Sequence, residues 1–383
     1  MKRILSVTFL NFFVSGGLTL TIPLLLLERK VDLIEIGVVI SILPLFFMII
    51  RLIFALAADL KGWNRFYLLV NWPSALISTI IYFVANSIPI FLMGKIAEAF
   101  KESSYWAVNR TAIFSLSPKR EEKEATRNIA VSLFSTALGG AMAGFGMAYL
   151  GFSSTLGLLV AASALIGFPA FFLWKAPKQN SVPSAKIRDL TNLRSKGKLF
   201  WSVSLIILFY SLARYPLITL LLPVFMSQQL GFSYTTIGIA YMTFNIIASI
   251  VALGTLRFAL GAKRVVIQSA ISLFALIFLA NSNGYFFILL AALAITEGLG
   301  TGFFESIIAR ATKKRVSVSF DIGLLHVPMR FAEFSSVLYA GVVAQYFGYM
   351  PIFVFSGVFF TVFSILSFRF LRISKELTEQ SIS

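Results

Sequence analysis

Polar and ionisable side chains recur at helical spacing within an otherwise apolar segment, residues 88–116. On a helix, their spacings of 3, 4, 3 and 4 place them in one stripe, which consists of Lys95, Glu98, Glu102, Tyr105 and Asn109. A charged group in hydrocarbon costs several kcal/mol, about 2.5–3.5 on the most lenient insertion scale. Such a stripe is tolerated only where it faces protein or water. It predicts a polar path inside a helical membrane protein, and its members are candidates for substrate binding or proton coupling.

A second acid, Glu297, stands in the later apolar segment 285–309. Counting about 1.5 Å per residue from Ile88 and Tyr285, Glu98 lies about 15 Å deep and Glu297 about 18 Å deep, near the middle of a bilayer. A carboxylate that can change protonation at this depth is what proton coupling requires. The alternative is a static ion pair of Lys95 with Glu98 or Glu102, and both interpretations remain open.

Arg214 is conspicuous in the apolar segment 199–226, with Tyr210 one turn earlier. Its guanidinium either contacts an anionic group of a substrate or neutralises Glu297 or Glu333. The residue types alone favour neither alternative. We therefore treat Tyr210 and Arg214 as candidate binding or coupling residues.

Two further polar faces follow helical spacing. In segment 320–346, His326, Arg330 and Glu333 share one face, and Arg330 with Glu333 is most simply an internal pair. A lone histidine is more often a hydrogen-bonded interior residue than a proton relay. Asn11 belongs to a polar face of the first apolar segment, which either lines a cavity or hydrogen-bonds to a neighbouring helix.

Composition indicates a polytopic helical membrane protein. The chain has 383 residues, of which 58% are hydrophobic and 13% are charged, against about 25% charged in soluble domains. Its mean hydropathy is +0.87, and its apolar runs are continuous rather than alternating, which favours helices over a barrel. The absence of cysteine excludes disulfides and thiolate metal sites. A single histidine and the lack of a nucleotide-binding loop predict no metal, no cofactor and no ATP-driven pump.

The apolar runs predict twelve membrane-spanning helices in two pseudo-symmetric six-helix bundles. Residues 1–174 would form the N-terminal bundle, 175–198 a basic cytoplasmic linker, and 199–383 the C-terminal bundle with a short cytoplasmic tail. The expected helices lie near 4–27, 33–58, 66–86, 88–116, 128–150, 153–174, 199–226, 233–257, 264–281, 285–309, 320–346 and 350–370. Gly140 and Gly144, at GxxxG spacing, predict a close helix contact.

Loop charges predict the orientation in the membrane. The net charge of +17 is scattered among short loops, which argues against nucleic-acid binding. Loops 61–65, 118–127, 175–198, 257–264 and 310–315 alternate with loops that hold only Arg29 and Lys30. The bias of Lys and Arg toward the inside therefore places both termini in the cytoplasm of a multi-pass protein of the cell (inner or plasma) membrane.

The second half of the chain repeats features of the first at an offset near 200 residues. Glu98 matches Glu297 at an offset of 199, and both stand at corresponding points of their halves. The other matches keep the same order: Pro23 with Pro223, Gly37 with Gly238, Gly62 with Gly261, and Gly151 with Gly348. Two parallel halves imply a binding site near the midplane between them, where Glu98 and Glu297 would face each other.

The turn after residue 58 resembles a signature of the major facilitator superfamily, G-x-x-x-D-x-x-G-R-[KR]. Asp59 and Gly62 match it, Ala55 replaces the first Gly, and the basic residue is delayed to Arg65. In the second half Gly254 and Gly261 match, with Phe258 in place of the acid. The stretch Gly94-Lys95-x-x-Glu98 is similar to the superfamily's G-R-x-x-Q-G motif.

The resemblance implies the fold and the role of the turn. It implies twelve helices in two bundles and a cytoplasmic gate at Asp59, Gly62 and Arg65 that stabilises the outward-open state. Arg51 would pair with Asp59 or extend to the cytoplasmic interface. The segment 128–150 lacks the Gly-Pro pair of drug antiporters.

These observations predict a secondary transporter of a small polar or charged solute, coupled to protons and working by alternating access. We expect a monomer in the lipid bilayer whose partners are the solute and protons, with no enzymatic activity. The first alternative is an efflux antiporter for lipophilic cations, since 40 Phe could line an aromatic cavity. The second, a non-transporting receptor or intramembrane enzyme, lacks any nucleophile–base pair or soluble domain to support it.

Overall fold

The computed structural model describes residues 1–117, 121–175, 193, 196–255, 262–279, 284–312 and 318–380. Most of the predicted linker 175–198 lies outside these ranges, as do Phe258 and Gly261 of the second-half motif. The N-terminal half is used below for residues 1–175, and the C-terminal half for residues 196–380.

The helices of the N-terminal half follow the apolar runs closely. A π-helical turn, η1, leads directly into α3, and α6 and α7 together cover one predicted helix. The elements are α1 (Lys2–Glu28), α2 (Leu33–Lys61), η1 (Tyr67–Asn71), α3 (Trp72–Val84), α4 (Ile88–Leu116), α5 (Glu121–Tyr149), α6 (Gly151–Leu165) and α7 (Gly167–Trp174).

The C-terminal half repeats this pattern of long helices. A second π-helical turn, η3, joins α9 to α10, so that these three elements cover the predicted helix 199–226. The elements are α9 (Lys198–Pro216), η3 (Leu217–Leu221), α10 (Leu222–Gln228), α11 (Tyr234–Thr255), α12 (Ala262–Leu279), α13 (Phe286–Thr312), α14 (Val318–Leu325), α15 (Val327–Phe347) and α16 (Met350–Gln380).

Two predicted helices are interrupted by proline. The helix expected over 153–174 breaks at Ile166, and the one expected over 320–346 breaks at His326. Pro169 and Pro328 stand three and two residues further on, and each lacks the N–H that would bond back to the preceding turn. In a third departure, α5 begins at Glu121, inside a stretch that we predicted to be a solvated loop.

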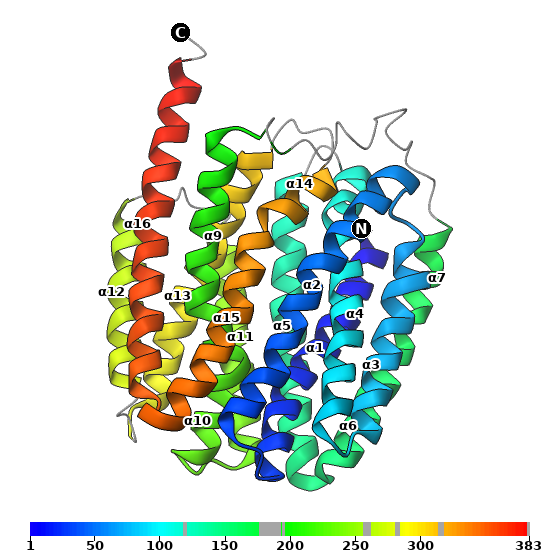
Figure 1. Ribbon diagram of the computed structural model, residues 1–383. Helices are drawn as coiled ribbons and strands as arrows, with labels where there is room; N and C mark the ends of the chain where they lie inside the picture. Colours follow the sequence, from blue (N-terminus) through cyan, green and yellow to red (C-terminus); the bar gives the residue numbers. More distant parts are fainter. Residues whose placement is uncertain are drawn as a thin grey trace.

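Nine helical segments in the described part of the chain are long and apolar enough to span a membrane. α4 is not one of them, because the charged residues that mark it as functional also lower its apparent hydropathy. The count of twelve spans therefore stays a prediction. In Figure 1 the long helices run roughly along one common direction, and both termini lie at the same end of the bundle.

The two halves meet along two helix pairs, α2 with α15 and α5 with α11. Glycines allow the close approach in both. A Cβ added to Gly144 would lie 2.5 Å from the Cα of Gly238, and one added to Gly341 would lie 2.6 Å from the carbonyl oxygen of Leu33. The close contact predicted for the GxxxG spacing is confirmed.

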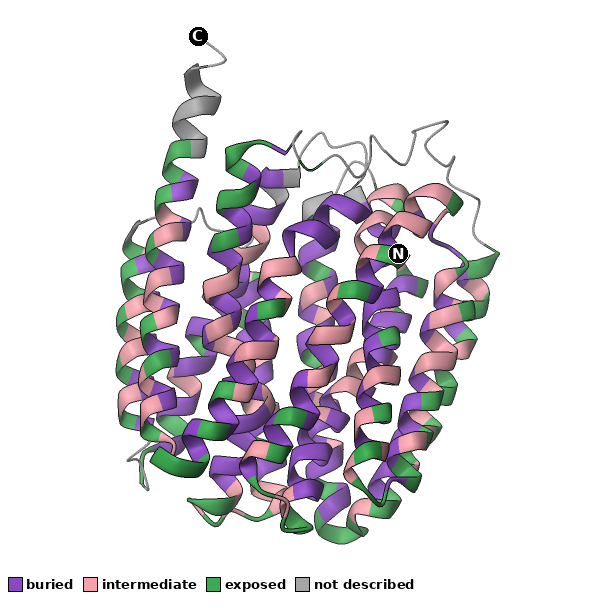
Figure 2. Ribbon diagram, viewed as in Figure 1, coloured by how far each residue is buried: buried purple, intermediate pink, exposed green. Residues whose placement is uncertain are grey.

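Burial follows the expected inside-out pattern of a membrane bundle. Figure 2 shows exposed residues along the outer flanks of the helices and buried ones within. Large apolar side chains such as Ile53, Phe168 and Phe274 are exposed on the outside. Lys95, Glu98 and Glu297 are buried. The polar groups are thus gathered inside an apolar shell.

Candidate functional site

The first cluster of buried charges lies between α3 and α4. Lys95 Nζ is 2.9 Å from Glu98 Oε2, and the Tyr82 hydroxyl donates to the same oxygen at 2.7 Å. Gly94 makes this possible, because a Cβ there would lie 2.4 Å from the Tyr82 ring. The static pair that we considered as the alternative to proton coupling is thus the arrangement present, with Glu98 rather than Glu102 as the partner of Lys95.

Glu102 is paired with a lysine that the sequence analysis missed. Lys101 Nζ lies 3.0 Å from Glu102 Oε1 and donates to Ser15 Oγ at 2.6 Å, and Ser15 donates in turn to Glu102 at 2.7 Å. The Lys101 side chain is 0% exposed. Lys101 does not belong to the stripe of polar residues predicted on α4, so the helical spacing of that stripe does not reveal it. The feature that marks Lys101 is a charged residue three positions after Glu98 in an otherwise apolar segment.

Tyr105 and Asn109, the last two members of the stripe, hold helices together. The Tyr105 hydroxyl is 2.8 Å from Thr8 Oγ1 on α1 and accepts from Asn128 Nδ2 on α5 at 3.1 Å. Asn109 accepts from the Tyr67 hydroxyl at 3.3 Å. These bonds tie α4 to α1, α5 and η1.

Asn11 also bonds to a neighbouring helix. It accepts at 3.2 Å from Asn71 Nδ2, which also donates to the Lys101 carbonyl at 2.9 Å. Of the two alternatives for the polar face of α1, helix-to-helix bonding is therefore the one observed at Thr8, Asn11 and Ser15.

The second cluster surrounds Glu297 on α13. Arg214 Nε and the Tyr210 hydroxyl both donate to Glu297 Oε1, the latter at 2.8 Å, and Tyr210 lies 3.3 Å from Thr301. The other carboxylate oxygen, Oε2, is buried without a hydrogen-bond partner. Arg214 thus neutralises Glu297, not Glu333. Its side chain remains 30% exposed, against 1% for Glu297.

The third cluster lies on α15. Arg330 Nη1 is 2.5 Å from Glu333 Oε2, the internal pair that we predicted, and Ser211 donates to Glu333 Oε1 at 3.2 Å. His326 Nδ1 lies 2.6 Å from the Ile322 carbonyl. This bond places His326 as an interior residue, the simpler of its two interpretations.

Glu98 and Glu297 do not meet as we expected from the repeat. Each is ion-paired inside its own half, and no contact in the described part of the chain joins them. Tyr215, which the sequence analysis missed, has charged groups of both halves around it. It lies within electrostatic range of Glu98 in one half and of Glu333 and Arg330 in the other. In the sequence, Tyr215 follows Arg214 directly, and a single tyrosine in an apolar segment does not by itself indicate a functional position.

The predicted gate joins the two halves at the end of the bundle where both termini lie (Figure 1). Asp59 Oδ2 accepts from the backbone N–H of Phe320 at 3.0 Å, in the first turn of α14. Gly62 ends α2 with φ +87°, which glycine adopts without strain. Arg65 is exposed and is not the partner of Asp59. The latch is therefore an acid with a helix N-terminus, instead of an acid with a cation.

Our prediction for Arg51, that it pairs with Asp59 or extends to the cytoplasmic interface, is wrong. The residue is buried, and its guanidinium lies 5.5 Å from the centroid of the Phe47 ring. Arg110 and Glu305 form an ion pair between the halves at the same end as Asp59, and Thr111 Oγ1 lies 2.5 Å from Ser319 Oγ. The sequence analysis missed these links because nothing in the sequence shows which residues of α4 face the other half.

The opposite end of the bundle has weaker links. Tyr234 donates to Glu28 at 2.7 Å, and the backbone N–H of Leu33 donates to Gln345 at 3.1 Å. No ion pair joins the halves at this end among the described residues. The termini end is thus the more strongly latched of the two.

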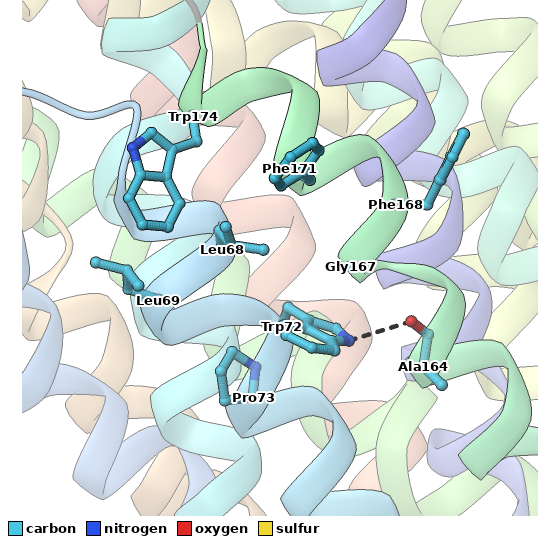
Figure 3. A pocket seen from close by; sticks show the side chains of 9 residues that line it. All are labelled: Leu68, Leu69, Trp72, Pro73, Ala164, Gly167, Phe168, Phe171 and Trp174. Carbon is cyan, nitrogen blue, oxygen red and sulfur yellow. Dashed lines mark hydrogen bonds between the residues drawn. The ribbon is translucent and has the colours of Figure 1, made fainter.

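A groove of about 650 Å³ lies on the flank of the bundle, between the η1–α3 segment and α6–α7. Figure 3 shows Leu68, Trp72 and Phe171 along it. The indole N–H of Trp72 donates to the Ala164 carbonyl at 3.1 Å, next to the break before α7. Because its lining is apolar and Phe168 is exposed beside it, this groove is no candidate for a polar solute.

A bundle of apolar helices that buries ion pairs along its interior, with two halves latched at one end, has the construction of a membrane transporter. The chain belongs to the Major Facilitator Superfamily, whose family model matches residues 4–267. It is a multi-pass membrane protein and a secondary transporter of small solutes, not an enzyme. No curated protein matches the sequence.

Solved transporters share the fold at low sequence identity. The human organic anion transporter MFSD10 (TETRAN) aligns with a TM-score of 0.72 and 15% identity, over 96% of this chain and 99% of that one. The nucleoside transporter NupG gives 0.70 and 14%, over 97% and 98%. A bacterial homologue of the human lysosomal transporter Spinster, inward-facing and unoccupied, gives 0.69 and 17%, over 97% and 96%.

Proposed function

We propose that the chain is a proton-coupled transporter with twelve membrane-spanning helices that carries a small polar or charged solute by alternating access. The observation that carries the proposal is the Arg214–Glu297 pair. A carboxylate that is 1% exposed accepts from a guanidinium that is 30% exposed, and the free oxygen of that carboxylate has no partner. A buried acid is stable as an anion only while its cation stays in place. Anything that draws Arg214 away favours a proton on Glu297.

The proposed coupling follows from that competition. A proton arriving at Glu297 Oε2 removes the charge that holds Arg214, and Arg214 then becomes free to face the solute or the other half. Tyr210, whose hydroxyl also lies 3.3 Å from Thr301 Oγ1, keeps the carboxyl group in place through either state. In this scheme Glu98, held by Lys95 and Tyr82, braces α4 against α3 and does not exchange protons during transport.

Alternating access would move residues 1–174 and 199–383 as two bundles, joined by the linker 175–198. The latch at Asp59 and the Arg110–Glu305 pair would open when the site turns toward the termini side. The distribution of loop Lys and Arg supports placing that side in the cytoplasm, in the cell membrane, and we propose that the protein works as a monomer.

Efflux of lipophilic cations is less well supported by the described interior. A cation of that kind needs an acid that is free to receive it, whereas Glu98, Glu102, Glu297 and Glu333 each carry a basic partner. The apolar groove on the flank has no acid among the residues that line it. We therefore retain the small-solute proposal.

The test is solute uptake by purified protein in proteoliposomes with an imposed pH gradient. Glu297→Gln removes the exchangeable proton and keeps the shape of the side chain, so gradient-driven uptake should be lost while exchange of solute without a gradient persists. Glu98→Gln is the matched control. If both variants respond to the gradient as the unmodified protein does, proton coupling through these carboxylates is ruled out.

A further inference from the structure

A group of basic side chains lies where α2 meets α15, and it joins Arg330 of the third cluster to residues of the N-terminal half. Phe47 and Arg51 stand one turn apart on α2, and Arg330 approaches from α15. The guanidinium carbons of Arg51 and Arg330 lie 5.5 and 3.9 Å from the centroid of the same Phe47 ring. The two halves of the protein therefore present one arginine each to a shared aromatic side chain.

The charges around this ring do not balance. Arg110 and His326 also lie within electrostatic range of Arg51, and among the described residues Glu333 is the one acid within that range. Arg330 already occupies Glu333 at 2.5 Å, and Arg110 is paired with Glu305. In the described part of the chain, no unpaired acid therefore remains next to Arg51.

Arg51 is buried without a counter-ion. The residue is 4% exposed, and no ion pair or hydrogen bond joins its guanidinium to the described residues. Its Nε has no hydrogen-bond partner, and neither has the Nε of Arg330. The Phe47 ring offsets only part of the desolvation of a cation. A buried charge without a partner is costly, which argues that an anion joins this place during the working cycle.

The surroundings of the two arginines are aromatic. Phe47 packs with Leu43, Ile50 and Ala99, and Trp106 lies against this group from α4. Guanidinium groups bind carboxylate and phosphate oxygens through paired N–H donors. Indole and phenyl rings pack against the apolar part of a ligand. The combination fits a small organic anion better than a fully hydrated inorganic one.

We propose that Arg51 and Arg330 bind the anionic group, a carboxylate or a phosphate, of the solute that this protein transports. Phe47 and Trp106 take up its apolar part. The inference rests on the proposed function and names its substrate class. Since Arg51 belongs to α2 and Arg330 to α15, an anion held by both connects the two halves, which couples occupancy of the site to their relative position.

The experiment compares the unmodified protein with Arg51→Met, Arg51→Lys and the surface control Arg3→Gln. Each is heated in detergent with benzoate, phosphate, choline or glucose at constant ionic strength. We expect benzoate to raise the melting temperature most, phosphate less, and choline and glucose not at all. Arg51→Met should lose the shift, Arg51→Lys should keep part of it, and Arg3→Gln should behave as the unmodified protein.

The melting temperature without ligand guards against misfolding. Arg51→Met removes an unpaired buried charge, so it should unfold at the same or a higher temperature than the unmodified protein. A variant that melts lower in the absence of anion means that Arg51 has a partner, which overturns the proposal. An anion shift that survives in Arg51→Met, or no shift with either anion in the unmodified protein, overturns it as well.

Uptake of the same four solutes into proteoliposomes separates this inference from the proposed function. Uptake of choline or glucose that Arg51→Met leaves unchanged would support a transporter and refute the anion site. Binding of benzoate or phosphate through Arg51, with no solute crossing the membrane, would support the anion-binding site but refute its role in transport. Benzoate or phosphate uptake that falls at least tenfold in Arg51→Met is the expected result.

Discussion

Glu98 and Glu297 occupy matching places in the two halves, yet their surroundings differ. Each accepts from one tyrosine hydroxyl and one basic side chain, at Tyr82 and Lys95 in the first half. In the second half the cation, Arg214, is 30% exposed, whereas the Lys95 side chain is 6% exposed. The two carboxylates are therefore chemically alike, but the cation of the first is shielded from solvent and the cation of the second is partly accessible. We call the first cluster closed and the second open in this sense.

This difference distinguishes an ion pair that stabilises the fold from one that can couple proton binding to transport. Lys95 is three residues from Glu98 on the same helix, so movement between helices does not separate them. Arg214 and Glu297 belong to α9 and α13, so a shift of these helices changes their distance. The two acids thus occupy equivalent positions in the repeat, and the location of the basic partner determines whether the acid can exchange protons during transport.

The largest expected effect is on transport by Glu297→Gln. The neutral amide cannot release a proton, so uptake driven by a pH gradient should be abolished. Glu98→Gln should retain gradient-driven uptake, because its carboxylate serves the α3–α4 contact. The comparison breaks if Glu98→Gln alone loses the response to the gradient, since the coupling role would then belong to the first half.

The second largest effect is on stability, through Lys95→Met. This change leaves Glu98 buried without its cation, which costs roughly 3–5 kcal/mol in the free energy of unfolding. Denaturant titration in detergent measures it. The double variant Lys95→Met with Glu98→Gln should recover most of the loss, because the uncompensated charge is gone. A double variant as unstable as the single one would show that the pair acts through packing and not through charge.

Removal of one tyrosine hydroxyl from each cluster sharpens the comparison further. A hydrogen bond to a charged group contributes about 1.5–3 kcal/mol, so Tyr82→Phe and Tyr210→Phe should each lower the free energy of unfolding by about that amount. Only Tyr210→Phe should also change the pH dependence of uptake, because Tyr210 bonds to the carboxylate that we propose to exchange protons. Equal pH profiles for the two variants would contradict the assignment of coupling to Glu297.

Much of this arrangement was predictable from the sequence. Helical spacing placed Lys95, Glu98 and Glu102 on one face, and hydropathy predicted most helix ends to within a few residues. The exceptions are the early start of α5 at Glu121, the breaks at Ile166 and His326, and the end of α16, which lies at Gln380 and not near residue 370. Partners across helices were not predictable, because they depend on rotation about each helix axis. For that reason Lys101 and Tyr215 were missed and the partner of Asp59 was a backbone N–H.

The smallest expected effect comes from the glycines beside the two tyrosines. A Cβ at Gly94 would lie 2.4 Å from the Tyr82 ring, and one at Gly300 would lie 3.1 Å from the Tyr210 ring and 2.7 Å from the amide nitrogen of Gln268. Gly94→Ala must therefore displace Tyr82 from Glu98, at about 1–3 kcal/mol for overpacking, measured by denaturant titration.

Gly300→Ala must shift the buried Gln268 amide, whose nitrogen donates to the Thr296 carbonyl at 3.1 Å. That bond joins neutral groups, whereas Gly94→Ala disturbs a bond to a carboxylate, so the cost of Gly300→Ala in the free energy of unfolding should be smaller. Gly254→Ala is the matched control, since an added Cβ there meets nothing within 4 Å. It corrects for the higher helix propensity of alanine. If Gly300→Ala is the more damaging of the two, the second cluster is the rigid one, and the assignment of a closed first half and an open second half must be reversed.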